Sequence, residues 1–360
     1  MPLLDPPPNQ KPVLPQPPRP IVAIGAGGIA RDAHQPAYRV AGFATVSVFD
    51  SDAGKAAAFA RDFGIPRSLP TLGGAVGTAP DSAVYDVAVP ARSLLAVLPE
   101  LPDGAAVLMQ KPMGENLAEA LAIRDLCRRK RLVAAVNFQL RYAPCVLAAR
   151  DIAARGLIGE ILDIEVRVTC FTPWHLWPFL AGIPRMEILY HSIHYIDLVR
   201  SFLGDPAGVW ASTVGHPKSP GLSSTRTSIA LDYGPRLRAT ITANHGHDFG
   251  PRHQESYLKI EGSRGAIKAR LGVNLDYPRG LPDKLEYCLA DAGNGAAWET
   301  VALDGCWFPD AFVGPMADLM RRANGETTAL PTGVEDAIRT MAVVEACYES
   351  SAKGSTPVPP

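Results

Sequence analysis

The sequence lacks the marks of several large classes of protein. No apolar run reaches the ~18 residues that cross a membrane as a helix. The six cysteines form no C-x-x-C pair and no cysteine–histidine spacing that suits zinc. The 35 basic side chains are balanced by 36 acidic ones, so the net charge is -1 and the basic excess typical of nucleic-acid binding is missing. We therefore expect a cytoplasmic protein with reduced cysteines and with neither a membrane nor a nucleic acid as partner.

The first twenty residues also lack the parts of a signal peptide, namely a basic start, an apolar core and a small-residue cleavage site. Nine of these residues are prolines. Because proline has no backbone donor and favours an extended chain, we expect residues 1–20 to form a mobile arm.

A glycine motif follows this arm. The apolar run IVAI, typical of a strand buried on both faces, leads into GAGGIA, which matches G-x-G-x-x-G/A. Gly25 permits a tight turn, Gly27 lets the backbone approach a pyrophosphate, and the small Ala30 lets helix and strand pack closely. We expect the amides of this loop, including those of Gly28 and Ile29, to bind a dinucleotide.

An acidic residue ends the next apolar run, ATVSVFD, and lies 25 residues after Gly25. The Asp50 carboxylate can accept hydrogen bonds from an adenosine ribose and would repel a 2′-phosphate. The cofactor expected is therefore NAD, although Lys55 and Ser51 leave NADP open. The alternative is that the glycines only make a turn and that Asp50 caps the next helix.

Strands continue to alternate with helices in the first half of the chain. Candidate strands lie at 85–90, 105–112 and 132–138, and candidate helices follow Asp52 and lie at 93–101 and 117–130. This order predicts a doubly wound parallel sheet, a Rossmann domain over residues 21–138. Ligands bind such sheets at the carboxyl ends of the strands, so Pro90, Lys111 and Asn137 are expected to share one rim with Gly25 and Asp50.

The second half of the chain has a different pattern of apolar and polar residues. Alternating or β-branched segments predict an α+β domain over residues 139–360, built on a large, mainly antiparallel sheet. These segments lie at 161–172, 227–234, 237–246, 255–263 and 265–272. Residues 332–355 read as an amphipathic helix ended by glycine.

One lysine stands directly after a candidate strand, in MQKPMG. Pro112 fixes the turn and biases Lys111 to an extended conformation, which would aim the amine of Lys111 into the cleft. The alternative is a solvated surface charge.

Five segments follow one another along the chain: IGAGGIA, FD, QKP, RYAPCVLAARDIAARGLIGEILDIEVRV and SIHYIDLVRSFLG. Together they resemble the Gfo/Idh/MocA family of oxidoreductases, and the resemblance runs from about residue 20 to about residue 350. The resemblance implies a Rossmann domain with an open-faced α/β domain, and a homodimer or homotetramer. It also implies that Lys111 lies near the nicotinamide and the reacting oxygen. The family usually has Glu-Lys-Pro, whereas this chain has Gln110, an uncharged residue that we expect beside the cofactor.

The family's second domain begins with a helix that commonly reads Asp-x-Gly-x-His, and its histidine falls on His194. Tyr190 stands in place of the aspartate. Such a helix places Tyr190, His191, His194 and Asp197 near one face. We expect His194 to be the general base, Lys111 to orient the hydroxyl and stabilise developing negative charge, and Tyr190 to hydrogen-bond the sugar. Asp197 is expected to orient His194, or else to be a surface acid.

Three further segments supply candidate contacts. Aromatic faces and hydrogen-bond donors that suit a carbohydrate are offered by Trp174 and His175 in TPWHLWPF and by His245 in NHGHDFGPRH. His191 is a further candidate of this kind. The histidine spacing H-x-H-x₅-H lacks a carboxylate or thiolate pattern, so we expect no metal. In NFQLRYAP, Gln139 is expected to contact the cofactor and Arg141 the substrate, with packing at a domain hinge as the alternative.

These features together predict an NAD-dependent dehydrogenase that oxidises a secondary or anomeric hydroxyl of a sugar, cyclitol or related polyol. One alternative is an NADP-dependent sugar or keto-sugar reductase. Another is a non-catalytic dinucleotide sensor or co-repressor of the same fold.

Overall fold

The computed structural model describes residues 4–277, 279–290 and 296–359, which form two compact units. The first unit contains Lys11–Ala143 and Phe308–Met341, and the second contains the residues up to Gln10, Pro144–Trp307 and the residues from Ala342 on. The sequence predicts contiguous domains, whereas each compact unit combines separate segments. The reason is that Phe308–Met341 buries its apolar side chains against the first sheet.

The first unit is built on six parallel strands in the order β3-β2-β1-β4-β5-β6. This is the strand order of a doubly wound Rossmann sheet. The apolar runs at 85–90, 105–112 and 132–138 form its strands β4, β5 and β6, as predicted. The strands are β1 (Ile21–Ile24), β2 (Thr45–Phe49), β3 (Ser68–Leu69), β4 (Val84–Val87), β5 (Ala106–Met109) and β6 (Val133–Val136).

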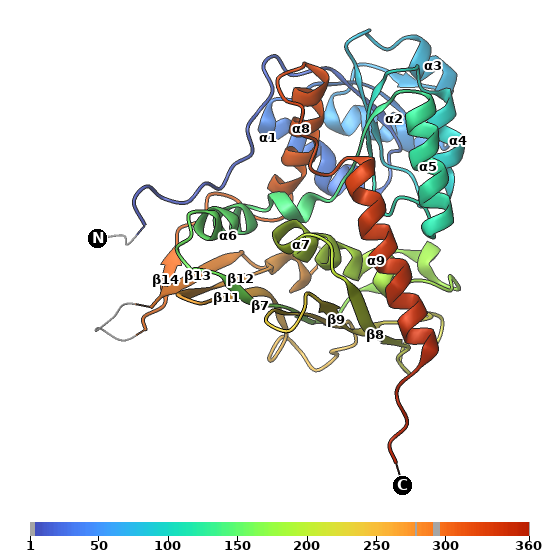
Figure 1. Ribbon diagram of the computed structural model, residues 1–360. Helices are drawn as coiled ribbons and strands as arrows, with labels where there is room; N and C mark the ends of the chain where they lie inside the picture. Colours follow the sequence, from blue (N-terminus) through green and yellow to red (C-terminus); the bar gives the residue numbers. More distant parts are fainter. Residues whose placement is uncertain (1–3, 278, 291–295, 360) are drawn as a thin grey trace. The chain divides into compact units, whose positions relative to one another are not determined.

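Helices connect these strands, and in Figure 1 the sheet lies between α1 and α8 on one side and α4 and α5 on the other. The predicted helix at 93–101 is broken into short segments, and α4 ends at Val97 because Pro99 lacks the backbone donor that would continue it. The helical elements are η1 (Ala30–His34), α1 (Gln35–Ala41), α2 (Ala53–Phe63), α3 (Leu72–Gly77), η2 (Ala91–Ser93), α4 (Leu94–Val97), η3 (Leu98–Glu100), α5 (Leu117–Arg129), η4 (Gln139–Tyr142), η9 (Asp310–Phe312), α8 (Val313–Ala323) and the start of α9 (Val334–Lys353).

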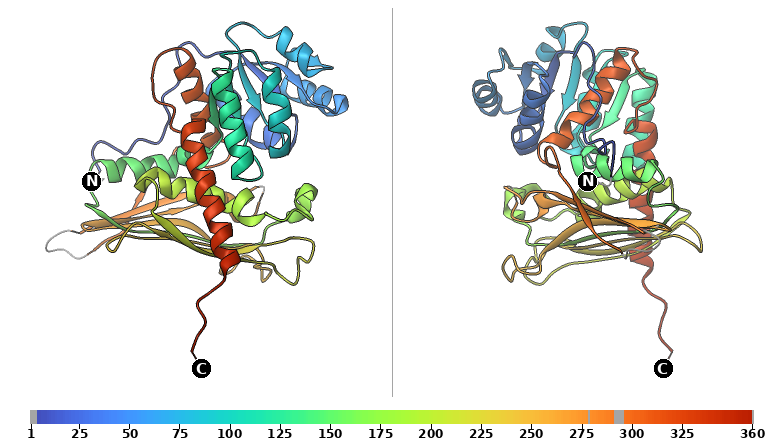
Figure 2. Two further views of the ribbon diagram at one scale, coloured as in Figure 1. Left: turned by 45° about the vertical axis from the view of Figure 1, so that its right-hand side comes forward. Right: turned by 90° about the vertical axis from the view of Figure 1, so that its left-hand side faces the viewer.

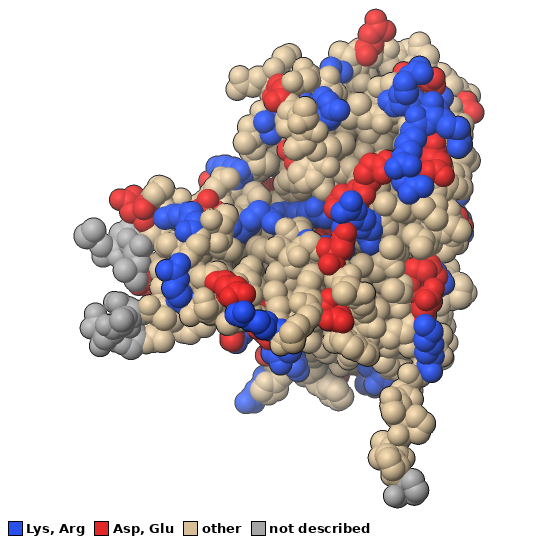
Figure 3. Space-filling model, viewed as in Figure 1, with Lys and Arg blue, Asp and Glu red and all other residues tan. Residues whose placement is uncertain are grey.

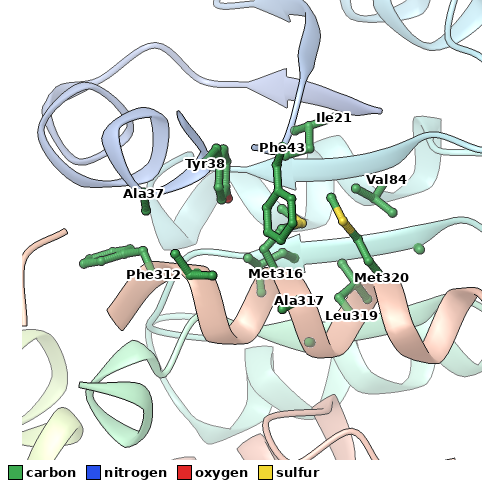
Figure 4. Close-up of a cluster of buried hydrophobic side chains, with 14 of the residues drawn as sticks. Ile21, Ala37, Tyr38, Phe43, Val84, Phe312, Met316, Ala317, Leu319 and Met320 are labelled. Carbon is green, nitrogen blue, oxygen red and sulfur yellow. The ribbon is translucent and has the colours of Figure 1, made fainter. Parts of the chain in front are cut away.

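A large buried cluster joins α8 to the Rossmann sheet (Figure 4). Met316 and Met320 of α8 belong to it together with Tyr38 and Phe43 from around α1, and all four are at most 6% exposed. Burying a large apolar side chain stabilises a fold by about 1.5–3 kcal/mol. The cluster therefore explains why a segment far along the chain completes the first unit.

The described residues of the second unit form an eight-stranded sheet in the order β14-β13-β12-β11-β7-β10-β9-β8, and among these strands only the pair β10 and β7 is parallel. The sequence did not predict β8, β13 and β14, which are short or lack clean alternation. The strands are β7 (Ile161–Thr169), β8 (Gly208–Val214), β9 (Arg226–Asp232), β10 (Arg238–Asn244), β11 (Glu255–Gly262), β12 (Gly265–Arg270), β13 (Lys284–Leu289) and β14 (Glu299–Val301).

The helices of this unit lie along one face of its sheet, and Figure 2 shows none of the unit's described helices over the other face. Buried and accessible residues alternate along β9 and β10, as expected for a sheet with one covered face. The helical elements of this unit are α6 (Pro144–Ala154), η5 (Trp174–Leu176), η6 (Pro178–Leu180), η7 (Ile188–Ser192), α7 (Ile193–Leu203), η8 (Gly272–Asn274) and the later part of α9.

The proline-rich arm differs from the mobile segment expected from its composition. Hydrogen bonds hold its described part, residues 4–20: the Pro6 carbonyl accepts from Arg155, the Gln10 side chain bonds Ala302 and Asp304, and the Gln16 amide donates to Glu326. An extended chain without partners of its own can be held in this way because its carbonyls and side chains remain available.

The surface carries both signs of charge. On the face drawn in Figure 3, basic and acidic side chains lie interspersed. Among the described residues, no helix combines the length and the apolar character that crossing a bilayer requires.

Candidate active site

The glycine loop adopts a conformation that only glycine fits at its first position. Gly25 has a φ of +105°, and a Cβ at this residue would lie 2.4 Å from the carbonyl oxygen of Ala88. Its amide donates to the Phe49 carbonyl at 2.7 Å, which fastens the loop after β1 to the end of β2. A Cβ at Gly27, in contrast, would meet nothing within 4 Å, so the backbone there is open to an approaching ligand.

The helix after this loop starts at Gly28 and passes through Ile29 into the π-helical turn η1, which begins at the buried Ala30. Gly27 and Gly28 are exposed, so the amide end of this helix faces solvent. A helix amino terminus attracts anions, and a pyrophosphate fits this position without a side chain in the way.

Asp50 directly follows β2, as predicted, and its carboxylate already holds the loop in shape. Oδ2 accepts from the Ala26 amide at 2.8 Å, and Oδ1 accepts from the Asp52 amide at 2.8 Å. The helix α2 is capped by Asp52, whose Oδ1 accepts from the Lys55 amide, so Asp50 is not the cap. Asp50 therefore combines a structural role with a position suited to a ribose.

Two residues near the ends of other Rossmann strands bear on the fit of a dinucleotide. Pro90 is exposed and precedes η2. Gln139, in η4, is only 3% exposed, and its Oε1 has no hydrogen-bond partner among the described residues. A buried carbonyl oxygen without a donor is costly, and a ligand that supplies one would relieve that cost. The open backbone at Gly27 and the oxygen of Gln139 both fit a bound NAD.

Lys111 follows β5, as predicted from MQKP, and is half-buried. Burial lowers the pKa of its ammonium to about 8, because the charged form loses hydration. Its backbone amide donates to Gln110 Oε1 at 2.7 Å. An amine that titrates near pH 8 can both carry a charge and release a proton under ordinary conditions.

Next to Lys111, Gln110 belongs to a buried polar network in which His34 and Asp86 were not predicted from the sequence. The Nδ1 of His34 lies 2.8 Å from the carboxylate of Asp86, and its Nε2 lies 3.4 Å from the Nε2 of Gln110 and 3.1 Å from the Nδ2 of Asn137. A neutral imidazole fits this arrangement, with Nδ1–H donating to Asp86 and Nε2 accepting from the amides. Gln110 then donates to His34 while accepting from Lys111, which a glutamate could not do.

We predict that Gln110→Glu lowers the free energy of unfolding by about 1–3 kcal/mol, because an acceptor replaces a donor opposite the Nε2 lone pair. Urea-induced unfolding followed by circular dichroism measures this. Gln254→Glu, which removes a hydrogen bond to the Gly250 carbonyl at the surface, is the control and should change stability by less than about 0.5 kcal/mol. Equal stability of Gln110→Glu and the wild type would contradict the network.

In the second unit, the helix predicted at 189–204 begins with the π-helical turn η7 rather than with an α-helical one. Tyr190 and His191, in this turn, are half-buried, whereas His194 and Asp197, in α7, are 8% and 1% exposed. Tyr190 packs against the ring of Phe179. A π-turn widens the helix, so the face predicted for an ideal α-helix applies from residue 193 onward.

The structure brings together two predicted residues, His191 and His245, with one that was not predicted, Glu187. Glu187 Oε1 lies 3.2 Å from His245 Nε2 and 3.7 Å from His191 Nδ1. Burial disfavours a charge on His245, but hydrogen bonding and electrostatic attraction to Cys170 and Glu187 outweigh this effect and raise the pKa of His245 to about 9. Glu187 was not predicted, because a single acidic residue beside an apolar helix does not by itself indicate such a cluster.

The remaining candidate residues, Trp174, His175 and Arg141, lie in different surroundings. Trp174 joins the cluster, since its ring packs edge-on against His245 with centroids 5.1 Å apart. His175 is exposed. Arg141 is buried in the first unit, where its guanidinium donates to the Pro331 carbonyl at 2.9 Å and to Asp336 at 2.6 Å. Its contact with a substrate stays a prediction.

Comparison with known proteins places this geometry in a family. The Gfo/Idh/MocA models match residues 20–138, described as the oxidoreductase family's NAD-binding Rossmann fold, and residues 152–359, its C-terminal alpha/beta domain. The 1,5-anhydro-D-fructose reductase of Ensifer adhaerens is 27% identical over 250 residues, 69% of this chain and 74% of that protein. The D-apiose dehydrogenase of Paraburkholderia graminis is 25% identical over 346 residues, 92% and 88% of the two chains.

Solved structures share the fold. An oxidoreductase from Agrobacterium radiobacter in complex with NAD+, L-tartaric acid and magnesium has a TM-score of 0.77 at 21% identity, covering 94% of this chain and 97% of that one. A levoglucosan dehydrogenase in complex with NADH and levoglucosan has a TM-score of 0.75 at 20% identity, covering 93% and 97%. With both of its domains matched, the chain belongs to the Gfo/Idh/MocA family and is an oxidoreductase with an NAD-binding Rossmann domain.

Proposed function

We propose that the protein is an NAD-dependent dehydrogenase that oxidises a secondary or anomeric hydroxyl of a sugar, cyclitol or related polyol. The observation that carries the proposal is the rim of the Rossmann sheet, where the open glycine loop, Asp50 and the low-pKa Lys111 all follow parallel strands. The names of the relatives, which include D-apiose dehydrogenase and levoglucosan dehydrogenase, support a carbohydrate substrate.

The chain's own residues divide the work of the reaction. NAD, when bound, accepts the hydride. The loop from Gly25 to Ala30 holds its pyrophosphate, Asp50 its ribose, and Pro90, Gln110 and Gln139 complete its site. The Lys111 ammonium donates to the substrate hydroxyl and stabilises negative charge on its oxygen as the proton leaves. His194 takes that proton as general base, and Tyr190 hydrogen-bonds the substrate.

Substrate binding is proposed for the aromatic and polar side chains of the second unit. Trp174 offers an aromatic face, and His175, His191 and His245 offer hydrogen-bonding groups, which together suit a polyhydroxylated ring. Arg141 is proposed as a further contact. The protein is proposed to work in the cytoplasm as a homodimer or homotetramer, a setting that suits its six free cysteines.

One assay separates the proposed function from its two rivals, an NADP-dependent reductase and a non-catalytic sensor. Purified protein is incubated with NAD and with NADP in the presence of a panel of sugars and cyclitols, and formation of the reduced cofactor is followed by absorbance. Reduction of NAD by one class of polyol supports the proposal. Reduction of NADP alone favours the NADP-dependent reductase working in reverse, a rival supported by the relative named scyllo-inositol 2-dehydrogenase (NADP(+)). Tight NAD binding without turnover favours a sensor.

We predict that Asp50→Ser raises the Kd for NAD about 10-fold or more and narrows the preference for NAD over NADP. Hydrogen bonds to a charged acceptor are worth about 1.5–3 kcal/mol, and removing the carboxylate also removes its repulsion of a 2′-phosphate. Titration calorimetry with both cofactors measures the change. Asp52→Ser, at the N-cap of α2, where serine caps about as well as aspartate, is the matched control and should leave NAD affinity unchanged. Unaltered cofactor preference in Asp50→Ser would count against the ribose role.

A further inference from the structure

We propose that Glu187, His191 and His245 form a binding site for one divalent transition-metal ion, with Zn²⁺ as the best match. The three side chains come from the residue that precedes η7, from the interior of η7 and from the residue after β10. Their ligand atoms all lie within 4.8 Å of one another. Metal binding at this cluster does not depend on the dehydrogenase activity proposed above.

Both spacings from the Glu187 oxygen to the histidine nitrogens are close to those of a zinc site. In a tetrahedral site with bonds of about 2.0–2.1 Å, neighbouring ligand atoms are separated by about 3.3 Å. Here the Oε1 of Glu187 lies 3.2 Å from His245 Nε2 and 3.7 Å from His191 Nδ1. Two histidines and one carboxylate are a zinc ligand set that leaves the fourth position open for water or for an oxygen of a bound ligand.

The buried carboxylate of Glu187 supplies an independent observation. Its side chain is 0% exposed, and Oε1 accepts from the hydroxyl of Ser192 at 2.8 Å. Oε2 has no hydrogen-bond partner among the described residues. A buried carboxylate with an oxygen unpaired is strongly unfavourable unless a cation compensates its charge.

The surroundings of His245 also suit a ligand. Its Nδ1 lies 2.8 Å from the hydroxyl of Thr172, so that Nδ1–H can donate there while Nε2 keeps its lone pair for the ion. Histidines that bind metals commonly donate their other ring N–H to such a partner. His191 is 20% exposed, whereas the other two ligands are fully buried, which gives the ion an entry path on the His191 side.

The π-helical turn brings the first two ligands together. Glu187 and His191 are four residues apart, and the turn η7 that joins them is wider than an α-helical one. Single π-helical turns inside helices occur often at functional sites. The wider turn offers room for an ion between the two side chains.

The test uses the full chain without a polyhistidine tag, stripped of metal by EDTA and then dialysed. Calorimetric titration with Zn²⁺ alone is expected to show one equivalent bound with a micromolar or lower Kd. Titration with Co²⁺ should produce the intense visible absorption of a four-coordinate site. His191→Ala, the change at the most accessible ligand, and Glu187→Gln, a nearly isosteric one, should each weaken Zn²⁺ binding by about 10-fold or more.

Two controls keep the outcome clear. His247→Ala removes a histidine two positions from His245 that bonds the Arg252 carbonyl instead, and it should bind Zn²⁺ like the wild type. Circular dichroism and thermal unfolding check that each variant is folded. If the stripped wild type takes up no stoichiometric Zn²⁺ at micromolar concentration, or if folded Glu187→Gln and His191→Ala bind it unchanged, the site is refuted and the cluster is an imidazolium–carboxylate pair.

Discussion

Replacing Lys111 with methionine is expected to lower kcat for polyol oxidation by about 100-fold or more, while the Kd for NAD changes little. Methionine keeps much of the volume of the side chain but removes the ammonium that, in the proposed mechanism, orients the hydroxyl and stabilises its oxygen. Steady-state kinetics with the substrate found in the panel, together with calorimetry for NAD, measures both quantities. A turnover close to that of the wild type would remove Lys111 from the mechanism.

The pH dependence of the wild type distinguishes two roles for this lysine. Burial lowers the pKa of Lys111 to about 8, so the charged fraction falls as the pH rises through that value. If the ammonium acts as proposed, kcat/KM has a falling limb near pH 8 that Lys111→Met lacks. If the neutral amine were instead the general base, kcat/KM would rise through the same pH range.

Stability gives a second readout for the same variant. An unfolded lysine titrates near ~10.4, so between about pH 8 and that value the unfolded chain binds more protons than the folded one, and stability rises with pH. Below pH 8 both states are protonated, and the folded state bears the full cost of the buried charge. Lys111→Met should therefore be more stable than the wild type at pH 7, by a margin that shrinks as the pH approaches 10.

Replacing His194 with glutamine is expected to lower kcat for the same oxidation by about 100-fold or more, because the side chain can still hydrogen-bond but cannot take the proton. Glutamine suits this position better than alanine, since His194 is 8% exposed and packs edge-on against Trp307, with ring centroids 6.3 Å apart. Stopped-flow measurement of a single turnover separates this loss from a change in product release.

Three comparisons make the result for His194 specific. Added imidazole should partly restore turnover in a His194→Ala variant, which a purely structural role would not allow. Tyr190→Phe, which removes one proposed hydrogen bond to the substrate, should raise KM more than it lowers kcat. His247, which lies outside the proposed site and bonds the Arg252 carbonyl, should leave kcat and KM nearly unaltered when it is changed to alanine. Full activity in His194→Gln would show that another group accepts the proton.

The Rossmann unit was largely predictable because its signals are local. The glycine motif, the acid at Asp50 and the buried strands follow one another at fixed spacing, and the strand order observed is the one that such spacing implies. The joining of Phe308–Met341 to the same unit could not be predicted. That contact depends on buried surfaces far apart in the sequence, which no local pattern encodes.

The site was predictable in part for the same reason. Lys111 and Gln110 were placed correctly at a strand end because MQKP follows an apolar run. His34 and Asp86 were missed, since they meet across 52 residues and each alone resembles an ordinary side chain of its element. Glu187 was likewise missed, because its partner His245 lies 58 residues away. Polar networks of this kind emerge only when the fold brings their elements together.

A crystal structure of the protein with NAD and a polyol that it oxidises tests the central proposal most directly. We predict that Lys111 Nζ and a ring nitrogen of His194 both lie roughly 2.6–3.2 Å from the hydroxyl oxygen on the carbon beside the nicotinamide. A complex in which either nitrogen points away from that oxygen, with another side chain in its place, would contradict the proposed division of the chemistry between these two residues.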